Sequence, residues 1–482
     1  MRKITFILSL VLLFCLTQKN YAQLENANWY FGLQAGLDFN DGTQAPTALT
    51  NSSMNTEGAS ASISDSSGNL LFYTNGINVW NSNHQIMTNG SDLFGNEEVN
   101  QSVIIVPDPG NTSKFYILTN EGDAMGLSGL YYSVVDMSLN SGLGDIDILQ
   151  KNELLLEYSA KNLTAILNPN DNTYWVVVFG YANDSSRNDT FYSFKVDGLG
   201  INTPVESTFT FTLPESEENI AYGGQMKISP DALSLALINN TVDDNLDLAQ
   251  SLFVYNFDNV TGSVSLLDDS ISLDNTDNFS SYGLEFSPDS NLLYVTTTYN
   301  LSERLQVGSL YQIDYKNTMN PPVLIHEDFD PIYALQLAID GKIYAVNSSG
   351  ELGVINTPNI PGTGADYIHE AINLGMVNIA IKELPQLVSE IVLAEDTKKA
   401  KKFIIMGNPF KEELKFKFKF IQTYTIEFYN SSGVLSKTEV YDDMTNRKIY
   451  KVNTSDLTTD TYYLIVRDEQ SQIWYETVLK ID

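Results

Sequence analysis

LEFSPDSNLLYVTTTY, residues 284–299, consists of two apolar runs, rich in β-branched and aromatic residues, on either side of a polar turn. Pro288 presets its backbone angle for a turn, and the Asp289 side chain can bond backbone amides nearby. Two short strands around such a turn predict a β-hairpin. Because a lone hairpin is only marginally stable in water, this one requires neighbouring strands.

Five further segments repeat this order of apolar run, polar turn and apolar run. They are SISDSSGNLLFYT (62–74), VIIVPDPGNTSKFYIL (103–118), AILNPNDNTYWVVV (165–178), MKISPDALSLALI (226–238) and LQLAIDGKIYAV (335–346). Equivalent apolar positions lie 42 to 62 residues apart, at Ile63, Ile105, Ile166, Ile228, Phe286 and Leu337. Since Asp or Asn occurs in the turn of all six units, we expect these side chains to bond the turn backbone rather than a ligand.

A third strand and a short fourth run follow several of the hairpins. The third strands are aromatic-rich and end in Asp (130–136, 191–197 and 252–258), with a looser copy at 309–315. Short fourth runs then begin at Gly142, Gly198 and Thr261. Four antiparallel strands in about 40–50 residues predict a β-propeller blade. A solenoid of helices is excluded, because no long segment of 3.6-residue period occurs beyond the N-terminus.

The length of the body, residues 23–393, predicts an all-β propeller of about seven blades, with six as the alternative count. Six repeats are recognisable. We expect the seventh blade to combine residues 384–393 with NWYFGLQAGLDF (28–39). Such a blade joins the two ends of the ring without leaving an open sheet edge.

Three segments of the body resemble, in order, a family of exported propeller-like, WD-repeat-like proteins of the Bacteroidetes. The shared features are the WYFG and GLDF pair (28–39), the GNLLFY hairpin with its VWN strand (61–87) and the SVIIVP strand (101–119). The family's closing Gly-Leu-Pro-Gln-Phe segment corresponds to Glu383-Leu384-Pro385-Gln386-Leu387, with two residues changed. The resemblance covers most of residues 28–390 and implies export and a propeller, but no agreed activity.

Residues 1–22 have the pattern of a secretory signal peptide. Arg2 and Lys3 provide the basic start, and Ile4 to Leu16 provide an apolar centre that is too short to span a bilayer. The single cysteine, Cys15, lies inside this segment. The mature chain is therefore expected to contain neither a disulfide nor a cysteine metal site.

The charge of the chain is concentrated in the body. Of 27 basic and 60 acidic residues, the body holds 10 and 46, because residues 394–482 hold 14 of each and the signal holds three basic residues. A net charge of −36 argues against nucleic-acid binding and against adsorption to anionic lipid. It predicts a solvated surface, or a calcium site at Asp243, Asn245 and Asp247, although the glycine and glutamate of a calcium loop are missing there.

Motifs for catalysis are missing from the sequence. His326-Glu327 and His369-Glu370 lack the second histidine of a zinc-protease helix, and we expect loop or strand-end positions for both, while His84 lies in a polar turn. There is neither a Gly-x-Ser-x-Gly elbow nor a phosphate-binding loop, and 46 acidic residues do not identify a carboxylate pair. We expect Trp29, Trp80 and Trp175 to lie in blade cores rather than to stack on sugars.

The composition changes at residues 394–403, where four lysines predict a linker. Seven short strand candidates make up residues 404–482, the first of them beginning at Phe403: FIIM, ELKFKFKF, YTIEFYN, VLSKTEVY, KIYKVNT, TYYLIVRD and WYETVLKI. The alternation in LKFKFKF indicates a strand with one solvated basic face. These strands predict a small antiparallel β-sandwich.

This C-terminal region resembles the type A C-terminal sorting domain of the type IX secretion system. The matching residues are Asn408, Pro409, Phe410, Gly433, Asp456, Leu457 and Lys480. The resemblance implies handling by the type IX machinery and a place outside a Gram-negative cell, released or on its outer surface.

Two functions remain open at this stage. We favour a non-catalytic binding or adhesion module for a glycan or protein ligand, without a cofactor other than calcium. The alternative is a secreted polysaccharide hydrolase or lyase with its site at the propeller channel. The residues specific to this protein are expected in insertions such as 88–100, 181–189 and 240–250, where loops on a rigid ring can carry a binding site.

Overall fold

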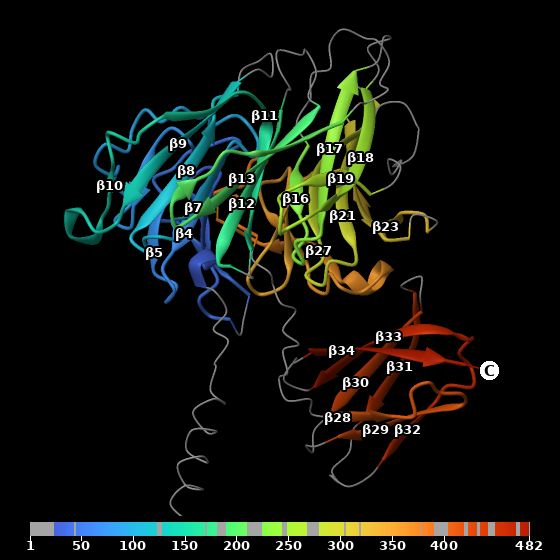
Figure 1. The fold of residues 1–482 in the computed structure, drawn as a ribbon. Helices are drawn as coiled ribbons and strands as arrows, with labels where there is room; N and C mark the ends of the chain where they lie inside the picture. The colour runs from blue at the N-terminus through green and yellow to red at the C-terminus, as the bar shows by residue number, and fades with distance from the viewer. Residues whose placement is uncertain are drawn as a thin grey trace, which may run out of the picture.

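The computed structural model describes residues 24–42, 45–122, 128–168, 171–180, 189–209, 224–242, 248–267, 279–302, 305–317, 320–375, 377–389, 403–418, 423–430, 434–441, 449–468 and 473–481. Its regular structure is almost entirely β-strand, as predicted. Figure 1 shows the sheets of the body, coloured blue to orange, and the layered C-terminal domain in red.

The first four blades occupy residues 28–208, and their strands pair antiparallel in chain order from inner to outer, except that the fifth strand of blade 4 pairs with the third. Blade 1 contains three strands, blade 2 three, blade 3 four and blade 4 five: β1 (Asn28–Phe31), β2 (Ala35–Asp38), β3 (Thr47–Leu49); β4 (Ala61–Ser64), β5 (Leu70–Thr74), β6 (Val79–Asn81); β7 (Val103–Pro107), β8 (Lys114–Asn120), β9 (Ser128–Asp136), β10 (Asp145–Ile146); β11 (Glu153–Asn168), β12 (Thr173–Gly180), β13 (Thr190–Asp197), β14 (Gly200–Ile201), β15 (Val205–Thr208). The first half of β11 also pairs with β9, so blades 3 and 4 share one sheet.

The last three blades each contain four strands: β16 (Met226–Ile228), β17 (Ser234–Val242), β18 (Leu248–Phe257), β19 (Val264–Leu266); β20 (Phe279–Phe286), β21 (Leu293–Ser302), β22 (Leu305–Ile313), β23 (Val323–Asp328); β24 (Ile332–Leu337), β25 (Ile343–Asn347), β26 (Leu352–Ile355), β27 (Tyr367–Ile372). Three short 3-10 helices lie in the body, η1 (Leu24–Asn26), η2 (Asn140–Gly142) and η3 (Gly362–Ala365). All six predicted hairpins form the two inner strands of a blade. In blade 6, Leu284 faces Val295 and Phe286 faces Leu293.

The body closes into a ring of seven blades, because each pair of neighbouring blades shares its own buried apolar cluster. Representative pairs, from the interface of blades 1 and 2 to that of blades 7 and 1, are Tyr30 with Tyr73, Phe72 with Phe115, Val106 with Val176, Trp175 with Tyr255, Val254 with Leu293, Leu310 with Ile343 and Trp29 with Tyr344. Seven interfaces for seven blades confirm a propeller and decide against the count of six.

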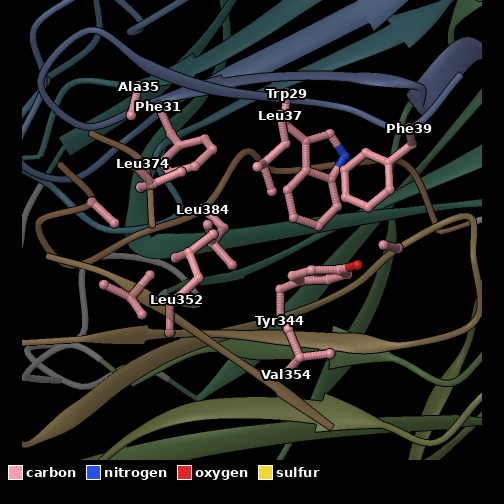
Figure 2. Packing of buried hydrophobic residues seen from close by; sticks show 14 of the residues in the cluster. Trp29, Phe31, Ala35, Leu37, Phe39, Tyr344, Leu352, Val354, Leu374 and Leu384 are labelled. Atoms are coloured by element: carbon pink, nitrogen blue, oxygen red, sulfur yellow. The ribbon is translucent and has the colours of Figure 1, made fainter. Parts of the chain in front are cut away.

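The interface between blades 7 and 1 closes the ring (Figure 2). The Trp29 ring lies 4.7 Å from that of Phe39 and 5.6 Å, edge-on, from that of Tyr344. Trp29, Trp80 and Trp175 are all buried, so their predicted place in blade cores is confirmed. Rings at these separations and angles gain energy beyond the area that they bury.

The prediction that residues 384–393 complete blade 1 is wrong for the part that the structure describes. Blade 1 takes its three strands from the N-terminal end, β1 to β3. Residues 384–389 form no strand with them, and Ser389 bridges to Ile166 of blade 4 instead. The ring is therefore closed by side-chain packing and by an isolated bridge between Leu33 and Ile379, rather than by a full strand from the far end of the body.

The C-terminal domain is a sandwich of two antiparallel sheets, ordered β28-β29-β32 and β31-β30-β33-β34. All seven strand candidates are confirmed: β28 (Phe403–Met406), β29 (Glu413–Phe418), β30 (Tyr424–Tyr429), β31 (Leu435–Tyr441), β32 (Tyr450–Asn453), β33 (Asp460–Asp468) and β34 (Ile473–Lys480). In β29, Leu414, Phe416 and Phe418 point into the core and Lys417 is exposed, as the alternation predicted.

Candidate functional sites

The six hairpin turns of the body use their aspartates to hold the backbone. In each turn the carboxylate accepts a hydrogen bond from the amide two residues later, at Asp65, Asp108, Asp171, Asp231, Asp289 and Asp340. The expectation of turn chemistry is therefore confirmed. These acidic residues account for part of the charge of the body.

Residues 378–389, here called the axial segment, run through the centre of the ring. Its backbone bonds to residues in or beside the inner strands of several blades: Ile379 to Leu33, Lys382 to Ala334, Gln386 to Ser60 and Ser389 to Ala165. Val388 packs in the cluster between blades 3 and 4. Only the axis of a ring is close to so many inner strands, so this segment fills the axis.

Glu383 places a carboxylate among these inner strands. Its oxygens accept hydrogen bonds from the Tyr282 hydroxyl (2.8 Å) and from Gln225 Nε2 (3.0 Å), and the residue is 3% exposed. Burial raises the pKa of Glu383 to about 7, against hydrogen bonds and the nearby Lys227 charge, which lower it. Gln225 Oε1 in turn accepts the amides of Leu284 and Leu335, which belong to blades 6 and 7.

A second buried contact beside it is the ion pair of Lys227 and Glu285, at 3.1 Å with both side chains about 5% exposed. Lys227 Nζ also donates to Gln336 Oε1 at 2.6 Å. The Glu285 carboxylate accepts the amides of Phe286 and Leu337. Lys227, Glu285 and Gln336 lie on β16, β20 and β24, so the pair joins three consecutive blades.

This axial network joins blades 5, 6 and 7, and the two carboxylates described in it are both buried and hydrogen-bonded. Each of Glu383, Glu285 and Lys227 is buried, and each has a partner. The sequence analysis did not identify these residues, because their meeting depends on the closure of the ring. One signal was present: Glu383 stands where the resembling family has glycine in its closing segment.

A different group of titratable residues lies on the outer strands of blades 6 and 7. His326 and Asp328 are on β23, and Tyr367 and His369 are on β27; together with Asp330 they are here called the rim cluster. The two imidazole rings stack at 4.6 Å with 22° between their planes. His369 Nε2 lies 3.1 Å from Asp330 Oδ2, and its Nδ1 lies 3.1 Å from the Tyr367 hydroxyl.

The rim cluster contains a buried nitrogen without a hydrogen-bond partner, His326 Nε2. Burial, followed by the neighbouring His369, lowers the pKa of His326 and favours the neutral imidazole. Although burial raises the pKa of Asp330, hydrogen bonds from Ser348, Ser349 and His369 hold it below its usual value. The site therefore combines neutral imidazole with ionised carboxylate.

The predicted loop or strand-end positions of His326 and His369 are wrong, since each lies within an outer strand. Considered one at a time, neither histidine has a second ligand close in sequence. The signal that was missed is the repeated His-Glu dipeptide at positions 326 and 369, which are 43 residues, or about one blade, apart. His84 is satisfied as expected, with Asn51 Nδ2 at 2.8 Å and the Tyr73 hydroxyl at 3.2 Å.

The predicted calcium ligands Asp243, Asn245 and Asp247 lie outside the described residues, as do residues 181–188 of the second insertion and the signal peptide. The insertion at 88–100 is described and is fixed by its neighbours. The Phe94 amide donates to Asn152 Oδ1 at 3.0 Å, and Lys151 Nζ donates to the Ser91 carbonyl. Phe94 is 48% exposed and meets the Tyr131 ring edge-on at 5.2 Å.

The sorting-motif residues of the C-terminal domain meet where its first and last residues pair. Asn408 Oδ1 accepts the Leu479 amide at 2.8 Å, and the Phe410 amide donates to the Leu479 carbonyl at 2.9 Å. Lys480 Nζ lies 5.8 Å from the centre of the buried Phe410 ring and donates to the Lys411 carbonyl. These residues therefore fix the end of the chain onto the sandwich.

The other motif residues support a second corner of the same domain. Leu457 is buried in the sandwich core, and Asp456 pairs with Lys437 at 2.9 Å. The hydrogen bond to Lys437 lowers the pKa of Asp456. Gly433 lies outside the described residues, in the connection between β30 and β31.

A comparison with family models matches residues 404–480 to the secretion system C-terminal sorting domain. The C-terminal domain is a type IX sorting domain. Such domains occur on proteins that the type IX system exports to the cell surface or the extracellular space in Bacteroidetes. The export route and location expected from the sequence are thus confirmed, and the protein is handled by the type IX machinery.

No curated protein matches the chain in sequence. Solved structures with similar folds include a puromycin hydrolase (13% identity, 55% of this chain and 38% of that one, TM-score 0.31). Another is the extracellular domain of a one component system from B. thetaiotaomicron (12% identity, 94% of this chain and 55% of that one, TM-score 0.37). A third is an exo-β-1,3-galactanase from Phanerochaete chrysosporium (8% identity, 82% of this chain and 97% of that one, TM-score 0.32). The chain spans less than two thirds of the length of the puromycin hydrolase and of the one component system domain. No helix in the described part of the chain is long and apolar enough to cross a bilayer.

Proposed function

We propose that this exported protein is a non-catalytic binding module, in which residues 23–393 form the propeller, 394–403 the linker and 404–482 the sorting domain. The observation that carries the proposal is the filled axis. Substrate-processing propellers need an accessible site, whereas here Glu383, Glu285 and Lys227 are buried and paired with one another or with neighbouring side chains. The alternative of a polysaccharide hydrolase at the channel has less support for the same reason.

The ligand surface that we propose lies on the face opposite the six aspartate turns. Because strands alternate in direction within a blade, the connections from second to third strands and from blade to blade all emerge on this face. The described insertion at 88–100 belongs to these connections, whereas residues 181–188 and 243–247 of the other two insertions lie outside the described residues. Loops on a rigid ring commonly carry binding residues.

Of the two ligand classes, the Phe94 and Tyr131 pair favours a glycan. An exposed ring held edge-on by a second ring, on a loop fixed by Asn152 and Lys151, offers a flat apolar surface of the kind that stacks on a sugar. A protein ligand is the second candidate, because exposed Leu154 pairs across the strands with Tyr131 and extends the same surface.

A glycan array and a hydrolase screen with the full secreted chain test the proposal. We expect binding to at least one envelope or environmental glycan without turnover, and a loss of about tenfold in affinity for Phe94→Ala, since a buried aromatic contact contributes about 1 kcal/mol or more. Leu199→Ala is the matched control, because Leu199 is 96% exposed in the turn between β13 and β14, on the other face. Turnover of any polysaccharide would contradict the proposal.

Deletion of residues 404–482 tests the route of export. We expect the truncated chain to remain inside the cell envelope, while the full chain reaches the surface or the medium. The measurement is an immunoblot of the medium and protease accessibility on whole cells. Secretion of the truncated chain at the level of the full chain would show that the sorting domain is dispensable.

A further inference from the structure

We propose that the rim cluster is a binding site for one divalent first-row metal ion, of which Zn²⁺ fits best, with His326, Asp328 and His369 as its protein ligands. One ligand atom from each residue lies within 4.8 Å of the others. Donors on a tetrahedral Zn²⁺ ion, at bonds of about 2.0–2.2 Å, lie about 3.4 Å apart. The most distant donors therefore need to close by up to about 1.4 Å, and one of the stacked imidazole rings needs to rotate so that both lone pairs point at the ion.

The lack of a hydrogen bond at His326 Nε2 leaves that nitrogen available as a ligand. His326 Nε2 is buried and lacks a hydrogen-bond partner, although Asp328 Oδ2 is only 4.0 Å away. That separation is too long for a hydrogen bond but suits two ligands on either side of a cation. A buried polar nitrogen without a partner is costly, and a metal ion would satisfy it.

Asp330 takes the role of the carboxylate that orients a metal-binding histidine. Because a carboxylate accepts only, its contact with His369 Nε2 places the imidazole proton on that nitrogen and leaves a lone pair on Nδ1. Asp330 is itself fixed by Ser348 and by the Ser349 amide at 2.9 Å. The Tyr367 hydroxyl, now 3.1 Å from His369 Nδ1, is the contact that the ion would replace.

The ligand types select the metal. Imidazole nitrogen suits Zn²⁺ and its first-row neighbours, whereas Ca²⁺ and Mg²⁺ prefer oxygen ligands throughout. Three protein ligands leave a fourth position, which faces solvent because the Asp328 side chain is half exposed. The ion would join β23 to β27, which belong to different sheets, and would thus link blades 6 and 7 at their outer strands.

Zinc titration of the full chain, purified without a histidine tag and freed of metal with EDTA, tests this proposal. We expect uptake of one Zn²⁺ per chain by calorimetry, a higher Tm that EDTA reverses, and visible absorption of tetrahedral Co²⁺ with Co²⁺ as the probe. His326→Asn and His369→Asn should abolish this uptake, and Asp330→Asn should weaken it about 10–100-fold. His84→Asn, which changes the third histidine, should bind Zn²⁺ as the wild type does.

Three results would overturn the proposal: no stoichiometric uptake by the wild type, unchanged uptake by His326→Asn, or equal losses in His84→Asn. Unchanged uptake would show that zinc binds to the acidic surface in general. If a histidine variant does not fold, Asp328→Asn supplies the same comparison, because this half-exposed side chain can be changed without opening the core.

Discussion

Ionisable side chains lie close together both at the axis and at the rim of this propeller, but their hydrogen bonding differs between the two places. At the axis, the Lys227 ammonium contacts Glu285 and Gln336, and Glu383 accepts bonds from Tyr282 and Gln225. At the rim, His326 Nε2 is buried without a hydrogen-bond partner, although a second imidazole and a carboxylate lie close by.

The difference teaches how to separate structural from ligand-binding polar groups in a fold with so many acids. A buried group whose hydrogen bonds are complete gains nothing from a ligand, and its loss exposes the partners that it leaves behind. A buried group with an unused lone pair is stabilised when a ligand or a metal ion occupies that lone pair. The axis should therefore be sensitive to substitution, and the rim sensitive mainly to metal.

Replacement of Lys227 by Met should have the largest effect on stability. It leaves the Glu285 carboxylate buried without its cation, which costs about 3–5 kcal/mol of the free energy of unfolding. Urea titration followed by tryptophan fluorescence measures it, since three of the four tryptophans lie in the body. Lys195→Met is the control: its pair with Asp171, 29% and 41% exposed, should contribute less than about 1 kcal/mol. Equal losses in the two variants would contradict the distinction.

Replacement of Gln225 by Leu should come next, at about 2–4 kcal/mol. The apolar side chain deprives the Leu284 and Leu335 amides of their acceptor and Glu383 of a donor. The same urea titration applies. Gln150→Leu, which removes a single contact with Asp147 at the surface, should change the free energy of unfolding by less than about 1 kcal/mol. A loss below that value for Gln225→Leu would mean that water can replace the side chain.

Part of the pH dependence of the free energy of unfolding should come from the ionisation of Glu383. Its pKa rises from an ordinary value of 4.5 to about 7 in the folded protein, so the folded state holds the proton more tightly. This contribution is complete below pH 4.5 and is lost as the pH rises to about 7, with a total of about 3 kcal/mol. Glu383→Gln should remove this part of the slope, whereas Glu57→Gln, at an exposed position, should retain it. Identical slopes in both variants would assign the pH dependence to other groups.

Replacement of His326 by Asn should have the smallest effect when metal is absent. The side chain gives up ring contacts with Tyr367 and His369 but no hydrogen bond at Nε2, so the loss should be about 1 kcal/mol or less. With Zn²⁺ present, the wild type should gain in Tm and the variant should not. A large loss of stability without metal would show that the rim, like the axis, has a structural role, and would contradict this prediction.

Much of the fold was predictable from the sequence, because its signals are local. The hairpin of residues 284–299 contains its own turn chemistry, and Asp289 holds the turn by the predicted contacts. The seven strands of the sorting domain follow from alternation of the same kind, as in Leu414, Phe416 and Phe418. Patterns of period two need no knowledge of distant residues.

The two polar sites were not predictable in this way, because each depends on which blades become neighbours. Glu383 meets Gln225 and Tyr282 only after the axial segment has entered the ring, and His326 meets His369 only when blades 6 and 7 pack. Closure itself was mispredicted for a related reason. Residues 384–389 have the apolar character of a strand, but their backbone bonds Ser60, beside blade 2, and Ala165 of blade 4 rather than one sheet edge.

The axial segment also orders events during synthesis. Because the axial segment follows every blade in the chain and bonds several of them, the centre of the ring stays open until residues up to Ser389 have been made. The remaining residues, 390–482, follow within about 5–20 s at ordinary elongation rates. Every chain that carries a complete sorting domain therefore also carries the segment that completes the ring, and a product that ends before the axial segment lacks the sorting domain as well.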